Sequence, residues 1–510
     1  MKSLQISRSD SKLVVVGALL TVLAYPPFHL FAPSFISLIP AVLLIMRSSA
    51  DEQPLRRSWA QGFWFGFASQ SLILYWLVIA LWRFTPLSLL AFLATVALYG
   101  VYTGIVFMLV GWIGRKTAIP IALSFPALWT GMDWWIGHQG DIAFPWLGLG
   151  TSLTAYPVVV QLADIVGARG ITFLLAVANT VLALAWLESS RPRRRWTLVG
   201  GVLAGLVASI SYGAVRMRTV DTTVGGNIAL IQPNIGFREK WEPGAQDSLF
   251  GFLTSMSEEA IRVTDPDLVI WPEAAVPNYF FNHPQWELAI ASQARSHAVP
   301  IVVGGFDIES YGDGGFDYYN TAFLFDETGS SNAQQPYHKR YLVPIVERVP
   351  FLTPSLLNMK WFGGFGVGDP GTIFDTEMGS FGVMICYESA FEDVARDYKQ
   401  RGADFLVNIT NDAWYGETSA PYQHAAHLVM RAIENRVGIA RGANNGISEF
   451  VDPLGRTYGE TRLGERLFTS GRLIMSDASS LYSKLGDWVG LLSVGVSILL
   501  CLYARTAGTK

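Results

Sequence analysis

Charged residues are scarce in this chain of 510 residues: Asp, Glu, Lys and Arg make up 15% of it, against about 25% in a typical soluble protein. Hydrophobic residues make up 51%, and this balance indicates a membrane protein. The net charge is only −4, which gives no reason to expect a nucleic-acid partner. The chain is too long for one ordinary core, so we expect two or more domains.

Cysteine is almost absent. The chain has two: Cys501 lies in an apolar C-terminal run, and Cys386 lies in a more polar region. We therefore expect no structural disulfide between them. A single thiol outside the apolar runs is compatible with a catalytic cysteine, although a lone cysteine is more often a small buried hydrophobe.

Long uncharged runs are concentrated before residue 214 and near the C-terminus. Eight stretches suit about 20 residues of membrane-spanning helix. They are Leu13–Phe31, Ala32–Met46, Trp59–Trp82, Leu87–Gly114, Ile119–Ile136, Ile171–Leu187, Trp196–Gly213 and Trp488–Tyr503. Prolines interrupt the first two, which we interpret as a short hairpin. A cleaved signal peptide is the alternative for the first stretch, but a second apolar segment follows it at once.

These runs predict a transmembrane domain of seven helices over residues 1–215, a separate domain over 220–478, and a last transmembrane helix over 485–505. If the helices alternate in direction, most basic residues of the short loops fall on one side. They are Lys2, Arg8, Lys12, Arg47, Arg56, Arg57, Arg115, Lys116, Arg191, Arg193, Arg194, Arg195, Arg505 and Lys510. The positive-inside rule then predicts cytoplasmic termini and a large domain outside the membrane.

Strand and helix patterns alternate between Arg216 and Ser479, which predicts a layered α/β domain. The expected strands are Asn227–Gln232, Asp267–Trp271, Ile301–Gly305, Thr321–Phe325, Phe381–Cys386, Phe405–Thr410 and Ile447–Val451. The expected helices are Asp247–Val263, Pro284–Ala298, Ala390–Arg401 and Tyr422–Val437.

Two of these strand ends and one further segment carry reactive side chains. FGVMICYE runs from Phe381 to Glu388, DLVIWPE ends on Glu273, and QPYHKRY contains Lys339. A carboxylate can take the proton of a thiol, and a nearby cation favours the thiolate. The same lysine, with the backbone N–H of Tyr387, can hold the oxyanion of a tetrahedral intermediate. We therefore expect Glu273, Lys339 and Cys386 to perform acyl transfer, with Glu347 fixing the lysine.

Histidine offers two competing interpretations. In a papain-like pair, His338 would point to the other face of its strand, and His424 and His427 lie on an expected helix with no visible link to the cysteine. A zinc site from His424, His427 and Cys386 lacks recognisable ligand spacing. We expect no metal site.

Aromatic residues cluster in three loops. Trp361 and Phe362 lie in a Gly-rich stretch, Tyr279 and Phe280 lie in another loop, and Trp146 follows Phe144 and Pro145. Trp, Tyr and Phe suit a membrane interface. We expect these side chains, and Trp414, to face lipid or substrate. A core-capping loop is the alternative for Trp361, and for Trp146 we favour ordinary membrane anchoring over substrate contact.

The motifs around these residues resemble those of one family. WPEAAVP, YHKRYLVPIVERVP and ICYE look like the three catalytic motifs of the nitrilase superfamily, in the branch of the bacterial apolipoprotein N-acyltransferases. Three further motifs fit the same branch: IQPNI with the downstream Trp241, FPWL, and NDAWYG with its Trp414. The resemblance covers nearly the whole chain.

This resemblance implies an αββα sandwich carried by about eight membrane helices, with the catalytic domain in the periplasm of a bacterial inner membrane. It implies that Cys386 takes an acyl chain from a phospholipid, usually phosphatidylethanolamine. The acceptor is the α-amino group of the S-diacylglyceryl cysteine of an apolipoprotein. Glu273 is then the base, Lys339 the oxyanion stabiliser and Glu347 a supporting carboxylate. Trp241, Tyr387 and Glu388 are further essential positions, and no cofactor is required.

Two other functions stay open on the residues alone. A membrane-tethered amidase or nitrilase would share the triad and release its acyl group to water. A transporter with a regulatory domain is disfavoured because Trp59–Trp82, Leu87–Trp112 and Trp196–Gly213 contain no charged residue. Transport usually leaves ionisable residues or broken helix pairs at mid-membrane.

Overall fold

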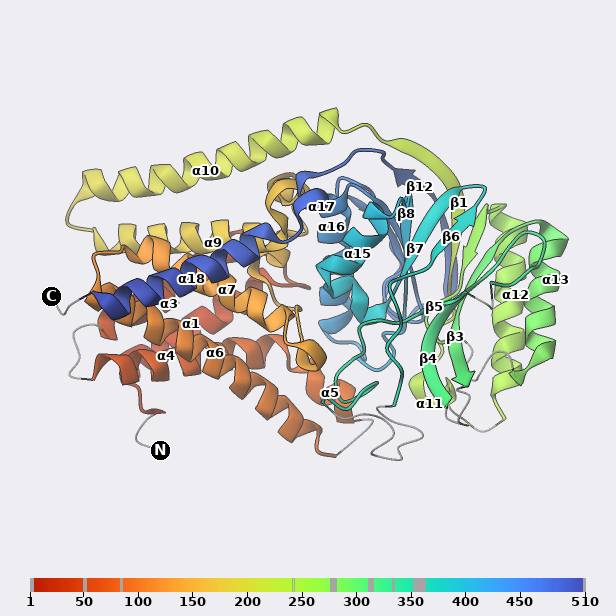
Figure 1. Cartoon of the computed structure of the whole chain (residues 1–510), viewed down its shortest axis with the longest axis horizontal. Coiled ribbons are helices and arrows are strands. Elements are labelled where there is room, and N and C mark those ends of the chain that lie inside the picture. Colours follow the sequence, from red (N-terminus) through yellow and green to blue (C-terminus); the bar gives the residue numbers. More distant parts are fainter. Residues whose placement is uncertain are drawn as a thin grey trace. The chain divides into compact units, whose positions relative to one another are not determined.

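Figure 1 shows the computed structural model of the chain. It describes residues 4–48, 53–82, 86–240, 242, 244–275, 282–310, 316–332, 335–351 and 364–507. The chain forms two compact units. The helical unit comprises Met1–Gln139, Ala143–Thr219 and Leu485–Lys510, and the α/β unit comprises Gly140–Ile142 and Val220–Lys484.

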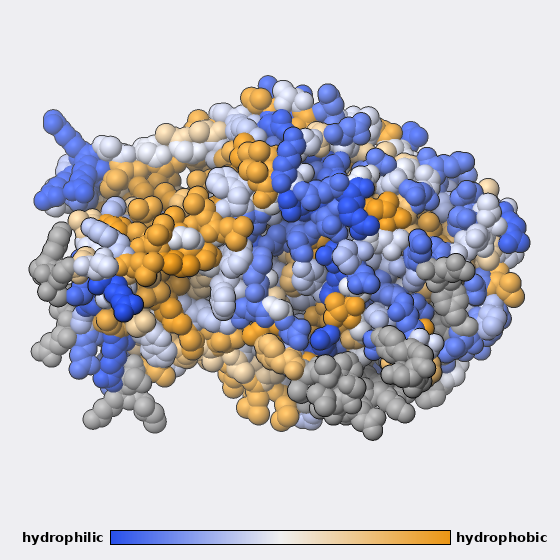
Figure 2. Space-filling model, viewed as in Figure 1, coloured by the Kyte–Doolittle hydropathy of each residue, from blue (hydrophilic) through white to orange (hydrophobic). Residues whose placement is uncertain are grey.

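The helical unit is built from apolar helices. They are α1 Arg8–Ala24, α2 Phe31–Ile36, α3 Ile39–Ser48, α4 Pro54–Ile73, α5 Trp76–Trp82, α6 Ser88–Lys116, α7 Ile121–Gly137, α8 Pro157–Val160, α9 Ala163–Leu187, α10 Pro192–Thr219 and α18 Trp488–Thr506. Large hydrophobic side chains such as Leu203 on α10 and Leu499 on α18 are exposed, and Figure 2 shows an apolar surface over these helices. Exposed apolar helices of this length cross a membrane, so the chain is a multi-pass membrane protein.

The number of spans differs from the eight expected. Within the described residues, five helical segments are long and apolar enough to cross a bilayer, or six if the bent pair α4 and α5 is one span. In that count α2 and α3 form one segment. α1 and α7, which we also expected to span, have 17 residues each and fall just short of the usual length.

The expected span Trp59–Trp82 is broken in the structure. α4 ends at Ile73, and α5 continues at an angle of 59°. Neither proline nor glycine stands at the break, so local sequence does not explain it. Trp76, the first residue of α5, is buried against Trp146 with ring centroids 5.5 Å apart. This buried contact holds the first residue of α5 in place.

Arg169 is a second difference. The expected span began at Ile171, but Arg169 lies inside α9 and is 7% exposed. Its Nη1 contacts Asp487 Oδ2 at 2.7 Å, and its Nε lies 4.0 Å from Asp133 Oδ2. A buried charge is tolerated when it is paired, so these carboxylates explain why the helix includes Arg169. The cluster joins α7, α9 and the start of α18.

The α/β unit contains two six-stranded sheets. The first has the order β12-β1-β2-β3-β4-β5, and the second has the order β11-β10-β9-β8-β7-β6. The strands of the first are β1 Thr223–Gln232, β2 Leu268–Ile270, β3 Ile301–Ser310, β4 Phe316–Phe325, β5 Tyr337–His338 and β12 Leu467–Met475. Those of the second are β6 Ile373–Thr376, β7 Gly379–Ile385, β8 Phe405–Thr410, β9 Gly438–Ala443, β10 Glu449–Val451 and β11 Thr457–Tyr458.

Helices cover the outer faces of both sheets, as Figure 1 shows. α12 Gln246–Thr264 and α13 Pro284–His297 pack on the first sheet, and α15 Glu392–Gln400 and α16 Ala420–Asn435 pack on the second. The sheets face each other through β1 and β9. The predicted αββα sandwich is therefore confirmed. Its central strands β2, β7 and β8 are buried on both faces, as parallel strands between helix and sheet must be.

Candidate active site

Three strand ends supply the side chains of the site. Glu273 follows β2 by three residues, Lys339 follows β5 directly, and Cys386 follows β7 directly. β2 and β7 are central parallel strands of the two sheets. In such sheets the carboxyl ends of the strands are where reactive side chains gather.

Glu273 and Lys339 form a buried ion pair. Lys339 Nζ lies 3.2 Å from Glu273 Oε1 and 2.9 Å from Glu347 Oε1. Lys339 is 1% exposed and Glu273 is 5% exposed. Burial alone would lower the pKa of the Lys339 ammonium, but Glu273, Glu347 and Cys386 together raise it above its ordinary value. The lysine is therefore a permanent cation between two carboxylates.

Asn320 on β4 bridges the same two carboxylates. Its Nδ2 donates to Glu273 Oε1 at 2.7 Å and to Glu347 Oε1 at 3.0 Å. The other oxygen of Glu273 accepts the backbone N–H of Asn411 at 2.8 Å. Glu273 is thus held from both sides. Sequence reasoning missed Asn320 because it lies inside an expected strand, where an asparagine gives no distinctive signal.

Cys386 is fully buried and has an unusual backbone. It begins the short 3-10 helix η5 Cys386–Ala390, and its φ is 53°, a left-handed value that non-glycine residues rarely adopt. Burial raises the pKa of its thiol well above the ordinary value; Glu273 raises it further, and Lys339 lowers it in part. Cys386 therefore lies within electrostatic reach of both residues and is held as a thiol rather than a thiolate.

Lys240, at the end of α11 Phe237–Lys240, is a second buried cation of the site. It is 1% exposed, and its Nζ donates to the backbone oxygen of Glu273 at 3.5 Å. Among the residues that the structure describes, no carboxylate lies within 4.0 Å of this nitrogen. Burial lowers the pKa of Lys240 to about 8, although Glu273 opposes this shift. Sequence reasoning missed it because nothing in FREK marks a buried lysine.

A polar cluster supports Cys386 from the side of α16. His424 Nε2 lies 2.9 Å from the backbone oxygen of Cys386, and His424 Nδ1 lies 3.0 Å from Asp412 Oδ1. Arg441 Nη2 contacts Asp412 Oδ2 at 3.0 Å. The interpretation that His424 has no link to the cysteine is therefore wrong. The tie is through the backbone, which a sequence pattern does not reveal.

Glu388 and Tyr387 also lie in η5. The Glu388 carboxylate is 0% exposed and accepts the Tyr337 hydroxyl at 2.7 Å and the backbone N–H groups of Ile385 and Arg340, each at 2.6 Å. These bonds fix the turn that carries Cys386 and join it to the segment that carries Lys339. Tyr387 is buried, and its ring packs edge-on against Phe391.

The aromatic residues expected to face lipid divide into three cases. Tyr279, Phe280, Trp361 and Phe362 lie outside the described residues. So does Trp241, which was expected to be an essential position and not a lipid-facing one. Trp414 is half-buried and stacks on Tyr415 at 5.3 Å. Trp146 is only 1% exposed and lies between Trp76 and Phe144. For Trp146 the lipid-facing prediction is wrong, because its ring is part of the core of the helical unit.

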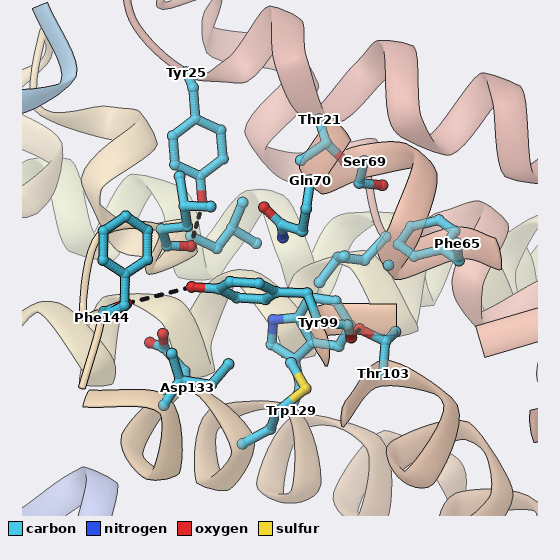
Figure 3. Close-up of a pocket in the computed structure, with 16 residues that line it drawn as sticks. Thr21, Tyr25, Phe65, Ser69, Gln70, Tyr99, Thr103, Trp129, Asp133 and Phe144 are labelled. Atoms are coloured by element: carbon cyan, nitrogen blue, oxygen red, sulfur yellow. Dashed lines mark hydrogen bonds between the residues drawn. The ribbon is translucent and has the colours of Figure 1, made fainter. Parts of the chain in front are cut away.

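The helical unit holds a cavity of its own, lined mainly by α1, α4, α6 and α7 (Figure 3). The space open to the centre of a water-sized sphere is about 40 Å³, enough for two or three water molecules. The Tyr99 hydroxyl donates to the backbone oxygen of Phe144 at 3.3 Å beside it. Ser69 Oγ and Gln70 Oε1 are buried with no hydrogen-bond partner among the described residues. Polar walls of this kind hold water, and none of Glu273, Lys339 and Cys386 lines the cavity.

Two family models match the chain. One, described as carbon-nitrogen hydrolase, matches residues 227–470, and the other, described as apolipoprotein N-acyltransferase N-terminal domain, matches residues 17–181. Among solved structures, an amidase from Nesterenkonia sp. has a TM-score of 0.38 and 20% identity, covering 52% of this chain and 95% of the amidase chain.

Similar full-length proteins carry the same family name over both units. The apolipoprotein N-acyltransferase of Geobacter metallireducens is 32% identical, over 94% of this chain and 92% of that protein. The apolipoprotein N-acyltransferase of Brucella melitensis is 30% identical, over 96% of this chain and 94% of that protein. Because these similarities cover both the membrane helices and the α/β unit, the chain belongs to the apolipoprotein N-acyltransferase family of acyltransferases, within the nitrilase superfamily.

Proposed function

We propose that this protein transfers an acyl chain from a phospholipid, phosphatidylethanolamine above all, to the N-terminal α-amino group of S-diacylglyceryl apolipoproteins, through a thioester on Cys386. The observation that carries the proposal is the buried Glu273–Lys339 pair, 3.2 Å apart and electrostatically coupled to the Cys386 thiol. A base, a cation and a thiol are the groups that acyl transfer through a thioester requires.

In the first half-reaction, Glu273 takes the thiol proton as the sulfur attacks the ester carbonyl. Burial raises the pKa of Cys386 well above its ordinary value, so a base must act during the attack rather than before it. The Lys339 ammonium and the Tyr387 backbone N–H stabilise the oxyanion. Glu273 then returns its proton to the departing alkoxide, and a lysophospholipid leaves.

In the second half-reaction, the α-amino group of the apolipoprotein attacks the thioester. Glu273 accepts a proton from the attacking nitrogen, and the same donors hold the second oxyanion. The C–S bond breaks, the thiol regains its proton, and the acyl chain remains on the new amide. Glu347 and Asn320 keep Lys339 and Glu273 in place throughout. This route uses no metal ion or cofactor.

The site is best explained by two substrates that bind in turn. Both are bulky amphiphiles, and a covalent thioester lets the lysophospholipid leave before the apolipoprotein enters. A hydrolase would instead admit water to the thioester. The multi-pass helical unit favours lipid-borne substrates, because a water-soluble amide would not require it.

We infer the orientation from the basic loop residues. They favour cytoplasmic termini and a catalytic domain, residues 220–478, in the periplasm of the inner membrane, with transmembrane domains over 1–215 and 485–505. This arrangement would place Cys386 on the side where exported apolipoproteins are matured.

The test is the mass of the protein after exposure to phospholipid without an acceptor. The full-length enzyme should gain one acyl mass that neutral hydroxylamine removes, and an added diacylglyceryl peptide should collect it. Cys386→Ala should gain none, while Cys501→Ala is the matched control and should react as the wild type does. A Cys386→Ala enzyme that still acylates the peptide would overturn the proposal.

A further inference from the structure

His424 touches the peptide group that follows the cysteine. Its Nε2 lies 2.9 Å from the carbonyl oxygen of Cys386, and both the His424 and the Asp412 side chains are fully buried. This carbonyl and the N–H of Tyr387 belong to one peptide group, so a contact with the oxygen acts directly on the N–H. In the proposed function that N–H donates to the oxyanion.

The contacts of His424 fix the orientation of its ring. Nδ1 faces the carboxylate of Asp412 at 3.0 Å, and Nε2 faces the carbonyl of Cys386. A carbonyl oxygen can only accept, so Nε2 donates to the Cys386 carbonyl. Thr410 also donates to Asp412 Oδ1, at 3.0 Å, and Arg441 binds the other oxygen. Asp412 is therefore anchored on three sides and sets the ring of His424.

A metal ion is the alternative for this cluster. Ligand atoms of Cys386, Asp412 and His424 lie within 4.8 Å of one another. A metal ligand needs a free lone pair on the imidazole, and Nε2 of His424 is used as a donor to the Cys386 carbonyl. Arg441 Nη2 also lies 3.3 Å from His424 Nδ1, and its positive charge opposes a second cation. The cluster is therefore a hydrogen-bond relay.

We propose that His424, held by Asp412, is a positioning residue that orients and polarises the Cys386–Tyr387 peptide and thereby strengthens the Tyr387 N–H as an oxyanion donor. The inference rests on the proposed function. A donor on the carbonyl side of a peptide draws electron density toward its oxygen and makes the N–H a better donor, as in any hydrogen-bonded chain of amides. The bond also helps to hold the left-handed backbone of Cys386, whose φ is 53°.

The size of the effect follows from two known magnitudes. One oxyanion donor is worth about 10²–10³-fold in rate, and a neighbouring bond strengthens it by about 10–30%. Loss of the His424 donor should therefore slow acyl-enzyme formation by roughly two- to eightfold through polarisation. Any loss of orientation of the Cys386–Tyr387 peptide would slow acyl-enzyme formation further.

The experiment compares two substitutions that differ in one hydrogen-bond donor. Glutamine and methionine have similar length and volume, but only the glutamine amide can donate to the Cys386 carbonyl. The full-length His424→Gln and His424→Met enzymes are incubated with phospholipid labelled with ¹³C at the ester carbonyl, without acceptor. Infrared difference spectra then give the stretching frequency of the Cys386 thioester. His427→Met, one turn further along α16, is the matched control.

The oxyanion donors lower this frequency in the wild type. The Met variant should move to higher frequency and acylate two- to eightfold more slowly, while the Gln variant and His427→Met stay near the wild type. Equal frequencies in the Gln and Met variants would overturn the inference. Both variants fill the same space, so a packing defect would affect them alike. Absence of a thioester band in the wild type would instead contradict the proposed function itself.

Discussion

Asn320 donates one hydrogen bond from its side-chain amide to Oε1 of Glu273, at 2.7 Å. The same nitrogen reaches Glu347 at 3.0 Å, so one amide holds the proposed base and its neighbour at fixed separation. A hydrogen bond to a charged group contributes about 1.5–3 kcal/mol. This contribution is large enough to determine where the base points.

Replacement of Asn320 should therefore impair acyl-enzyme formation. Asn320→Leu keeps the shape and removes the donor, and we expect a rate loss of about tenfold or more. Asn320→Asp places a third carboxylate beside Glu273 and Glu347, so we expect a larger loss. The rate is measured as the acyl mass gained per unit time with phospholipid alone. A wild-type rate in Asn320→Leu would show that the amide does not hold the base.

Glu273→Gln should slow the same step far more. The amide keeps the size of the side chain but cannot accept the thiol proton, and general-base catalysis contributes about 10²–10⁴-fold. Thermal unfolding serves as the control, because the variant must remain folded for the rate to be informative. Rapid acylation by folded Glu273→Gln would identify another group as the base.

The sequence predicts the bounds of a strand or helix of the sandwich well where a single residue pattern runs through the whole segment. β8 Phe405–Thr410 has the bounds expected from its apolar run, and α13 differs by one residue at its end. The edge strands β5, β6 and β11 were not expected, because two to four residues carry too little pattern. β9 reads GIARGA, and its buried Arg441 conceals a central strand. A buried arginine of this kind needs partners such as Asp412 and Asn408, which are distant in the sequence.

The same limit applies to the site. Glu273 and Cys386 could be predicted because the strand before each of them is apolar. The sequence does not predict the roles of Asn320, Lys240 and His424, because these roles depend on contacts with backbone atoms or with carboxylates from other strands. The prediction for Trp146 was wrong for a related reason. A tryptophan near a membrane is compatible with both an interface and a core, and only the packing around its ring distinguishes the two.

The orientation can be tested by labelling in intact cells. Arg193 lies in the first turn of α10 and is exposed, and Glu377 is an exposed residue of the α/β unit. A membrane-impermeant thiol reagent should label Glu377→Cys and leave Arg193→Cys unlabelled until the cells are opened. Labelling of Arg193→Cys in intact cells would reverse the proposed topology.

Glu388→Gln should lower stability as well as activity. The Glu388 carboxylate accepts the Tyr337 hydroxyl and three backbone N–H groups, so an amide NH₂ in its place would face donors. Each unmet buried group costs about 1–3 kcal/mol, and we expect a Tm several degrees lower than that of the wild type. Glu460→Gln is the control because Glu460 is exposed. An unchanged Tm with lost activity would indicate a direct role in the chemistry.

The protein should become more stable but less active when Lys240 is replaced. Burial lowers its pKa from 10.5 to about 8 in the folded protein, so the folded state binds the proton less tightly than the unfolded state. Its contribution to stability is therefore greatest above pH 10.5 and is lost as the pH falls through about 8. Below that pH the buried ammonium costs about 3 kcal/mol.

Lys240→Met removes this cost, because methionine fills the space without a charge. Its Tm should exceed that of the wild type most at pH 7, and the difference should shrink as the pH rises from about 8 to 10.5. Lys484→Met is the control, since Lys484 is exposed and should show no such trend. Acyl-enzyme formation should fall in Lys240→Met, because Lys339 alone then balances Glu273 and Glu347. A Tm difference independent of pH would mean that burial does not lower the pKa of Lys240.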